Sequence, residues 1–352
     1  MLTLGVESSC DETAVALVED GRVLANAVRS QVALHAPFGG VVPDLAARAH
    51  AEAIDLVAEE AFRAAGRRPD EVEAVSATVA PGLVNCVVVG MSWAKAFAVA
   101  REVPFVAVDH LEAHVFACML PAPGAPEGEQ AGGAPGLEPP FVCLLVSGGH
   151  TGLYRYEGPG RIRRLGRTVD DAAGEAFDKV AALLGLPYPG GPHVEQAARD
   201  GDPFAFDLPR ARVKGRRYDV SFSGLKTAVL YATRGKNQPR SAPLLEGVRV
   251  PDVAASFQEA ACEVLVDVAV DAALDEGVGA LALGGGVACN GRLRALAAAR
   301  GRAQGLDVVA AHPAYCTDNA AMVAALGAAY LAAGLSGPDD LARGGEARSV
   351  LA

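Results

Sequence analysis

Several features that mark whole classes of protein are missing from this sequence of 352 residues. It has no C-x-x-C pair, and its seven cysteines, an odd number, lie in apolar stretches such as those around Cys143 and Cys262. Such cysteines are typical of small core residues in a reducing compartment and argue against a disulfide framework. No basic segment opens the sequence, and no apolar run reaches the length of a membrane span without a charge. We therefore expect a cytoplasmic protein that is neither exported nor anchored.

Positive charge is scarce as well, because 42 Asp and Glu residues outnumber 31 Lys and Arg residues and give a formal net charge of -11. This balance argues against a protein that coats nucleic acid nonspecifically, although it is compatible with a local basic face. The motifs G-x-x-x-x-G-K-[ST] and G-x-G-x-x-G do not follow any expected strand. The sequence therefore predicts neither a P-loop nor a Rossmann nucleotide site.

What is present is a pattern that occurs twice. Residues 2–21 and 141–160 each predict a strand, a polar turn and a second strand. Each hairpin is followed by a helix, over residues 42–62 and 250–270, and then by two strand–turn–helix segments. Because the chain is too long for one ordinary core, we expect two such α/β lobes with a cleft between them. The apolar stripes expected on the two helices are Leu45, Ala49, Ala53 and Leu56, and Phe257, Ala261, Val264 and Val268.

A pair of histidines, His110 and His114, lies in the segment VDHLEAHVFACML. On a helix this spacing places both imidazoles on one face, where they can bind one metal ion. The zinc-protease pattern H-E-x-x-H is absent, because Glu112 stands two positions after the first histidine and points away from both rings. Two partly exposed histidines that bind nothing are the alternative, and a third ligand would decide between the two.

The repeat offers that third ligand. Asp318 stands at the point of the second half that corresponds to His110 and His114 in the first half. If strand ends of both lobes converge at the cleft, its carboxylate joins the two imidazoles, and the open coordination positions of such a group suit substrate polarisation. The alternative is that Asp318 only caps the helix that follows it.

Turns rich in glycine and serine predict phosphate binding. Ser147, Gly148 and Gly149 separate two apolar strands, so that their backbone N–H groups can approach an anion. They correspond to residues 8–9 of the first half, and residues 284–286 precede a helix. Ordinary tight turns are the alternative. Phosphate loops divided between two hairpins are typical of the duplicated α/β fold of actin, Hsp70 and sugar kinases (ASKHA), which has two lobes around a cleft.

Seven segments, spread in order over residues 3–333, together resemble one family. They are VESSCDET, GGVVPDLAARAH, HLEAH, LVSGGHT, DDAAGEAFDKVAALLGLPYPGGP, SFSGLKTA and CTDNAAM. The chain is thereby similar to the tRNA N6-adenosine threonylcarbamoyltransferase family of the bacterial TsaD type, once described as an O-sialoglycoprotein endopeptidase. The resemblance implies transfer of a threonylcarbamoyl group from threonylcarbamoyl-AMP to the exocyclic amine of adenosine 37, in tRNAs that read codons beginning with A. AMP is the leaving group.

Carried over by position, the resemblance implies one divalent metal ion per chain, iron or zinc, on His110, His114 and Asp318. Asp178 and Glu195 would accept hydrogen bonds from ribose hydroxyls, although either carboxylate taken singly would be a surface or capping group. The full set of residues implied to bind the adenylate is Leu145, Val146, Ser147, Gly148, Gly149, Asp178, Gly191, Glu195 and Asn290.

The expected reaction needs no covalent intermediate. The metal would bind the threonyl carboxylate or hydroxyl, and positioning and charge stabilisation would supply most of the rate. Asp11 and Glu12, beside the first turn, are the candidates that accept a proton from the amine or orient it. The alternative is that one or both only brace the turn.

The resemblance also suggests how the chain is divided. We expect a first lobe with two metal ligands over residues 1–118, a mobile loop rich in Pro and Gly over 119–140, and an adenylate-binding lobe over 141–320. A helix and tail over residues 321–352 would pack back toward the first lobe. The chain departs from the family pattern at Leu145, where archaeal relatives offer a tyrosine to the metal.

Partners follow from the family and from one basic cluster. Residues 210–217 contain five basic side chains, which suits contact with tRNA phosphates but is also typical of a solvated surface. Bacterial relatives act with a degenerate ASKHA paralogue and a small ATPase, and the helix with Leu45 and Leu56 would supply a surface for the paralogue. No contact with a membrane is expected.

Two rival functions use the same fold, namely a nucleotide-dependent switch or scaffold and a sugar kinase. Proteins of both kinds rely on Mg²⁺ with carboxylates and have no need of an imidazole pair. The group of two histidines and one aspartate therefore favours the transferase.

Overall fold

The computed structural model describes residues 1–124, 137–210, 212–239 and 241–349. The chain forms two compact units. Unit 1 comprises Met1–Pro139, Glu157–Ile162 and Ala311–Ala352, and unit 2 comprises Pro140–Tyr156 and Arg163–Ala310. The second unit thus ends before residue 311 and not at residue 320, because the helix that follows packs on the sheet of unit 1. Most of the expected mobile loop, residues 125–136, lies outside the described residues.

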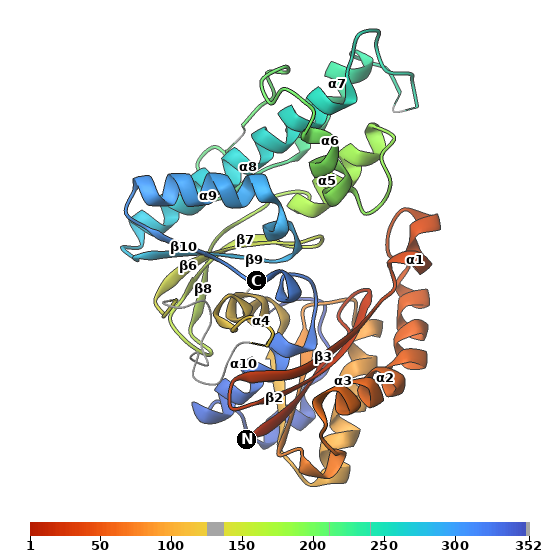
Figure 1. Cartoon of the computed structure of the whole chain (residues 1–352), viewed down its shortest axis with the longest axis vertical. Coiled ribbons are helices and arrows are strands. Elements are labelled where there is room, and N and C mark those ends of the chain that lie inside the picture. The colour runs from red at the N-terminus through yellow and green to blue at the C-terminus, as the bar shows by residue number, and fades with distance from the viewer. Residues whose placement is uncertain (125–136, 211, 240, 350–352) are drawn as a thin grey trace. The chain divides into compact units, whose positions relative to one another are not determined.

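Unit 1 is built on a mixed sheet whose described strands follow the order β3-β2-β1-β4-β5 (Figure 1). The antiparallel part consists of β1 (Leu2–Glu7), β2 (Glu12–Glu19) and β3 (Arg22–Ser30). β4 (Ala74–Ala80) lies parallel to β1, and β5 (Phe105–Asp109) lies parallel to β4. These three parallel strands are buried along their whole length, as expected when helices cover both faces of a sheet.

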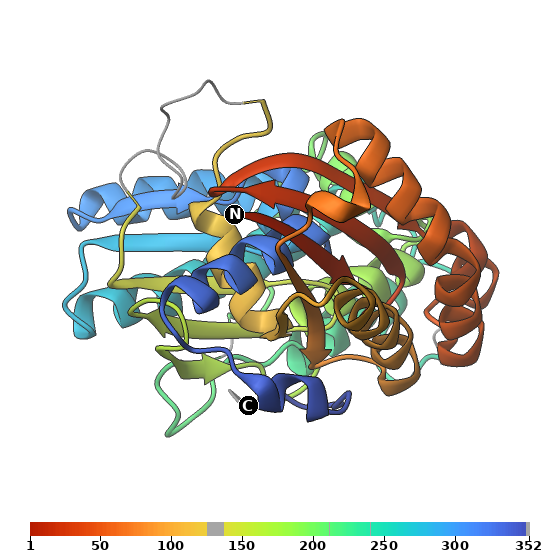
Figure 2. The same ribbon diagram turned by 90° about the horizontal axis from the view of Figure 1, so that it is seen from below.

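Helices cover both faces of this sheet. α2 (Pro43–Ala65) and α3 (Val84–Arg101) pack on one face, and α10 (Ala320–Ala332) packs on the other (Figure 2). Successive side chains of a strand point to opposite faces, so β2 contributes Val15 to the core under α2 and Ala16 to the core under α10.

The buried face of α2 differs from the predicted stripe. Leu56 is 56% exposed, whereas Ala53 is buried. The buried stripe of α2 runs through positions 50, 54, 57 and 61, so position 56 points away from the core. Its buried residues are Ala46, His50, Ala53, Ile54, Val57, Ala58, Ala61 and Phe62. The stripe predicted on the corresponding helix of unit 2 is confirmed, since all four of its residues are buried.

Unit 2 repeats the same topology, with described strands in the order β10-β9-β6-β7-β8. β6 (Phe141–Val146) pairs antiparallel with β7 (Thr151–Tyr156), and β8 (Ile162–Arg167) lies beside β7. β9 (Ala280–Gly284) lies parallel to β6, and β10 (Asp307–Ala310) lies parallel to β9. The two sheets therefore have equivalent strand orders, and the duplication predicted from the sequence is confirmed.

The helices of unit 2 belong to two groups. α8 (Val250–Asp275) packs against β6, and α9 (Gly291–Ala303) packs against α8. α5 (Ala173–Leu183), α6 (Gly190–Ala198) and α7 (Ser223–Arg234) are inserted between the meander and α8. The short elements of the chain are α1 (Val32–His35), α4 (His110–Phe116), and the 3₁₀ turns η1 (Ala36–Phe38), η2 (Pro69–Glu71), η3 (Ala117–Met119), η4 (Gly286–Cys289), η5 (Pro313–Tyr315) and η6 (Pro338–Ala342).

Within the described ranges, no helix combines the length and the apolar character needed to cross a membrane.

The close packing of α10 on β1 yields a first prediction. A Cβ atom built on Gly5 would lie 2.4 Å from the carbonyl oxygen of Ala320 and 2.6 Å from the backbone nitrogen of Ala324. Gly5→Ala should therefore push α10 off the sheet and lower the free energy of unfolding by about 1–3 kcal/mol, the usual range for overpacking. Gly40→Ala is the control, because its Cβ would meet nothing within 4 Å. Equal melting temperatures of the two variants would contradict the prediction.

Candidate metal centre

The histidine pair lies on α4, directly after β5. Asp109 ends the strand and begins the helix, because its Oδ1 accepts hydrogen bonds from the backbone N–H groups of Leu111 at 2.9 Å and Glu112 at 3.2 Å. Both imidazoles are buried, with 4% of His110 and 1% of His114 exposed. Their ring centroids are 4.5 Å apart. The alternative of two partly exposed histidines is therefore wrong.

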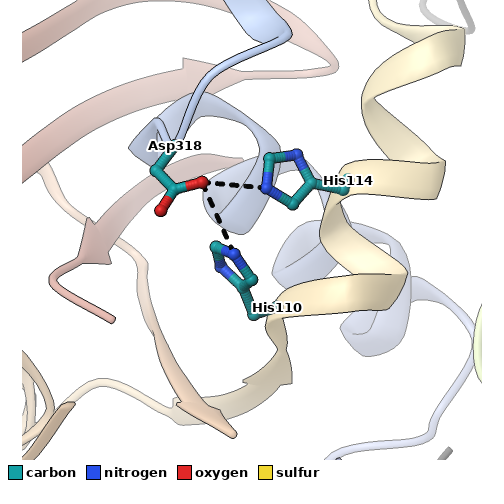
Figure 3. A group of neighbouring side chains, drawn as sticks. All are labelled: His110, His114 and Asp318. Atoms are coloured by element: carbon teal, nitrogen blue, oxygen red, sulfur yellow. Dashed lines mark hydrogen bonds and ion pairs between the residues drawn. The ribbon is translucent and has the colours of Figure 1, made fainter. Parts of the chain in front are cut away.

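Asp318 completes the group, as Figure 3 shows. Its Oδ1 lies 3.0 Å from Nε2 of His114 and 3.5 Å from Nε2 of His110. The three ligand atoms lie within 4.8 Å of one another. All three residues belong to unit 1, so the expectation that the second lobe contributes Asp318 is not met. The chain returns to unit 1 after β10, and η5 and α10 bring the carboxylate to the histidines.

Asp318 is not the cap of α10. Asn319 has that role, since its Oδ1 accepts a hydrogen bond from the backbone N–H of Met322 at 3.1 Å. The capping alternative for Asp318 is therefore excluded, and its carboxylate is directed at the imidazoles instead.

A second buried carboxylate, which sequence reasoning missed, orients His110. Glu7 is fully buried at the end of β1, and its Oε2 lies 2.9 Å from Nδ1 of His110 and 2.5 Å from the hydroxyl of Thr78. The backbone N–H of Ser9 donates to its Oε1 at 2.5 Å. A carboxylate that accepts from one ring nitrogen leaves the other nitrogen for a metal ion, a common arrangement in metal sites. A glutamate that ends an otherwise apolar strand was the available signal.

The charges of this group favour a bound cation. Burial raises the pKa of Glu7, but the neighbouring imidazole of His110 outweighs it and the net pKa is lowered. Burial likewise lowers the pKa of His110, but Glu7 and Asp318 outweigh it and raise that pKa to about 9. The two carboxylates thus attract positive charge, and a proton and a metal ion compete for the imidazole of His110.

The residues present fit a metal ion by their chemistry. Two imidazoles and one carboxylate are a ligand set suited to zinc or iron and leave coordination positions open. The ligand atoms face one another, and Glu7 selects the ring nitrogen of His110 that faces Asp318. The described structure therefore has a group that can hold a metal ion.

Glu112 has no part in this group, as predicted. Its side chain accepts a hydrogen bond from the backbone N–H of Gly160 at 2.7 Å and another from the hydroxyl of Tyr330 at 2.6 Å. The carboxylate joins α4 to α10 on the side away from the imidazoles, and a zinc-protease arrangement is excluded.

Asp11 and Glu12 follow the turn after β1, in the same unit. The hydroxyl of Ser30 donates to Oε1 of Glu12 at 3.1 Å. Burial, with the nearby negative charges of Asp318 and Asp11, raises the pKa of Glu12 to about 9. In the metal-free chain this carboxyl is therefore protonated at neutral pH.

Three of the predicted adenylate residues link neighbouring elements of unit 2. The carbonyl of Ser147 accepts from the N–H of Gly174, at the start of α5. Asp178 of α5 accepts from the N–H of Gly190, at the start of α6, at 2.6 Å. Glu195 of α6 accepts from the N–H of Gly291, directly after Asn290, at 2.9 Å.

The exposed part of this set is its glycine backbone. Cβ atoms built on Gly148, Gly149 and Gly191 would meet nothing within 4 Å, so these backbones are open to a ligand. Leu145 and Val146, by contrast, have fully buried side chains in β6.

Asn290 is already engaged within unit 2. Its Oδ1 caps α9 through the N–H of Leu293 at 3.0 Å, and its Nδ2 donates to Gln258 at 2.8 Å. Its side chain is buried at 6% exposure. These contacts hold the start of α9 in place.

The basic cluster at residues 210–217 is largely neutralised. Arg210 pairs with Glu263 at 2.7 Å, Arg212 with Asp271 at 2.7 Å, and Arg217 with Asp275 at 2.7 Å. The three carboxylates lie at helical spacing along α8. The charge of these three arginines is therefore matched by one acidic face of α8, and contact of the cluster with tRNA phosphates stays a prediction.

Comparison with known proteins gives consistent matches. The sequence model described as tRNA N6-adenosine threonylcarbamoyltransferase matches residues 22–325. The protein of that name from Syntrophobacter fumaroxidans is 51% identical over 331 residues, which are 94% of this chain and 94% of the relative. The one from Syntrophotalea carbinolica is 46% identical over 342 residues, which are 97% of this chain and 95% of the relative.

Solved structures share the fold. HypF from T. kodakarensis matches with a TM-score of 0.61 and 18% identity, over 97% of this chain and 48% of that chain. The ROK hexokinase from Thermus thermophilus matches with a TM-score of 0.50 and 17% identity, over 95% of this chain and 99% of that chain. At these identities the likeness shows the fold alone, and it agrees with the ASKHA architecture inferred from the repeat.

The role of Glu7 can be tested by metal binding. Glu7→Gln removes the negative charge that orients His110, so the affinity for zinc should fall about 10- to 100-fold, as for other carboxylates that support a metal-bound histidine. Glu259→Gln is the matched control, because it also neutralises a buried carboxylate, but one that pairs with Arg292 in unit 2. Competition titration with a chelator measures both variants. Equal zinc affinities would refute the role of Glu7.

The raised pKa of Glu12 predicts a pH-dependent stability of the metal-free chain. With a pKa of about 9 in the folded state against an ordinary value of 4.5, the folded chain binds this proton more tightly than the unfolded chain. Wild type therefore loses stability as the pH rises from about 4.5 to about 9. Glu12→Gln lacks this loss. The melting temperature of the variant relative to that of wild type should therefore increase across that pH range. Exposed Glu60→Gln serves as the surface control, and a constant advantage of Glu12→Gln would contradict the prediction.

Proposed function

The chain belongs to the tRNA N6-adenosine threonylcarbamoyltransferase family, and from this membership we propose the reaction that it catalyses. It transfers the threonylcarbamoyl group of threonylcarbamoyl-AMP to the exocyclic amine of adenosine 37 and releases AMP. The substrates are tRNAs that read codons beginning with A. The single observation that carries this proposal is the identity of 46–51% to transferases of that name over nearly the whole chain.

A switch, a scaffold and a sugar kinase share the fold but are not favoured. The likeness to a hexokinase is limited to the fold at 17% identity. The buried group of His110, His114 and Asp318 supports the transferase, because nucleotide sites that rely on Mg²⁺ use oxygen ligands.

We propose that His110, His114 and Asp318 hold one divalent ion per chain, iron or zinc. When bound, the ion would supply positive charge for the carboxylate or hydroxyl of the threonyl group. Glu7 would fix the ring of His110 in the orientation that binding needs.

The amine of adenosine has to lose a proton during the transfer. Asp11 and Glu12 are the carboxylates that we assign to this step or to the orientation of the amine.

In unit 2, we assign the adenylate to the open glycine turns and the carboxylates beside them. Gly148 and Gly149 would offer backbone N–H groups to the phosphate, and Asp178 and Glu195 would accept from the ribose hydroxyls. The side chain of Asn290 is already hydrogen-bonded within unit 2. Asn290 would therefore contribute indirectly, by holding the start of α9. The complete assigned set is Leu145, Val146, Ser147, Gly148, Gly149, Asp178, Gly191, Glu195 and Asn290.

The proposed partners follow from the family. They are tRNA, the degenerate ASKHA paralogue and the small ATPase, in the cytoplasm. The paralogue would bind at α2, where Leu56 is 56% exposed.

The reaction can be tested on cellular tRNA. In cells depleted of this chain, threonylcarbamoyladenosine in tRNA hydrolysates should fall, and a wild-type copy should restore it. His110→Ala should fail to restore it, because a ligand is lost, whereas Glu60→Ala should succeed, because that exposed side chain lies outside the metal group. Mass spectrometry of nucleosides measures each strain. Unchanged threonylcarbamoyladenosine after depletion would defeat the proposed function.

A further inference from the structure

The turn that carries Asp11 and Glu12 is held through three successive backbone carbonyls. The carbonyl of Ser9 accepts from the N–H of Leu83 at 2.9 Å, and the carbonyl of Asp11 accepts from the N–H of Gln31 at 2.8 Å. Both of these donors are backbone groups, which any sequence would supply. The carbonyl between them, that of Cys10, accepts instead from a side chain, Nε2 of His50 at 3.0 Å.

The partners of His50 fix its protonation. A carbonyl can only accept, so Nε2 carries the hydrogen that is donated to Cys10. The other ring nitrogen, Nδ1, then accepts from the hydroxyl of Thr13 at 2.7 Å and from the amide of Gln31 at 3.2 Å. A ring with one donor and one acceptor is neutral. Burial agrees with this state, because it lowers the pKa of His50.

The network continues beyond His50 until each side chain in it has a partner. The Gln31 amide also donates to the carbonyl of Ala46 at 3.3 Å, and its oxygen lies 3.1 Å from Nε2 of His35. Nδ1 of His35 accepts from the N–H of Val42 at 3.3 Å. Thr13, His35 and His50 are wholly buried, and Gln31 is 6% exposed. A buried network with its donors and acceptors matched is rigid and permits one arrangement.

Packing alone does not account for a histidine at this position. The other buried residues of α2 are Ala, Ile, Val and Phe, and an apolar side chain would fill the space without burying two ring nitrogens. What an apolar side chain cannot supply is the hydrogen bond to Cys10, the residue directly before Asp11.

We propose that His50 is a positioning residue for the transfer reaction, whose Nε2–H fixes the Cys10 carbonyl and thereby the direction in which Asp11 and Glu12 project. This role rests on the proposed function, because it acts through the two carboxylates assigned to the amine. His50 itself does not touch substrate.

Two substitutions separate positioning from packing. His50→Phe keeps a ring of similar size and removes the donor, whereas in His50→Gln an amide nitrogen can again donate to Cys10. Thr233→Val in α7 is the control for the loss of one buried hydrogen bond, since the hydroxyl of Thr233 donates to the carbonyl of Val229 within that helix. The assay uses the full chain, loaded with zinc and with the proteins that copurify with it, on tRNA and threonylcarbamoyl-AMP.

The expected result is a loss of turnover without a loss of binding. In His50→Phe, kcat should fall about 10- to 100-fold, as expected when reacting groups are displaced by up to about 1 Å. KM for tRNA and the zinc content should stay within about twofold of wild type, His50→Gln should recover most of kcat, and Thr233→Val should keep it. A folded His50→Phe chain with the kcat of wild type would overturn the proposal, as would a His50→Gln chain no better than His50→Phe.

A measurement on the wild-type chain covers the case in which His50→Phe does not fold. Nitrogen-15 NMR of histidine-labelled protein at neutral pH should show His50 neutral with its hydrogen on Nε2, assigned by the absence of that signal from His50→Gln. A charged ring, or a hydrogen on Nδ1, would overturn the proposal. A wild-type chain that is inactive on tRNA would instead count against the proposed function.

Discussion

The packing of α10 on the sheet of unit 1 is the constraint on which the candidate metal centre depends. Asp318 lies just before this helix. The two histidines lie 204 residues or more before Asp318 in the sequence. The helix can lie on β1 because Gly5 has no side chain, and it is held to β4 by the hydroxyl of Ser76, which donates to the carbonyl of Val323 at 3.0 Å. A close backbone approach in the core thus determines whether three ligand atoms meet.

Around the three ligand residues, most of the polar side chains form hydrogen bonds with one another and not with solvent. Glu7 orients one imidazole, Glu112 joins α4 to α10, and the hydroxyl of Ser349 donates to Oδ2 of Asp109 at 2.5 Å, at the start of the helix that carries both histidines. Buried polar groups are stable only when their partners are present. The site is therefore preorganised by a shell of hydrogen bonds that extends from β1 to the last described residue.

The sequence predicted the outline of this arrangement better than its details. Two hairpins, two long helices and the equivalent positions of the histidines and Asp318 follow from patterns that are local or repeated, and the structure has them. Glu7 and His50 were missed because their roles depend on which face of a strand or helix is buried, and α2 turned its alanines and not Leu56 toward the sheet. The ion pairs of the arginines at residues 210–217 could not be predicted from the sequence, because the carboxylates that match them lie more than 50 residues later, at Glu263 and beyond.

The return of the chain to unit 1 has a consequence for biosynthesis. A ribosome that adds about 5–20 residues per second needs roughly 10–40 s to proceed from His114 to Asp318, 204 residues later. During this interval the apolar face of the first sheet that α10 covers, including Val18, Val106 and Val108, has no helix over it. The nascent chain cannot assemble the three-ligand group until Asp318 and α10 emerge, so translation itself delays the formation of this group.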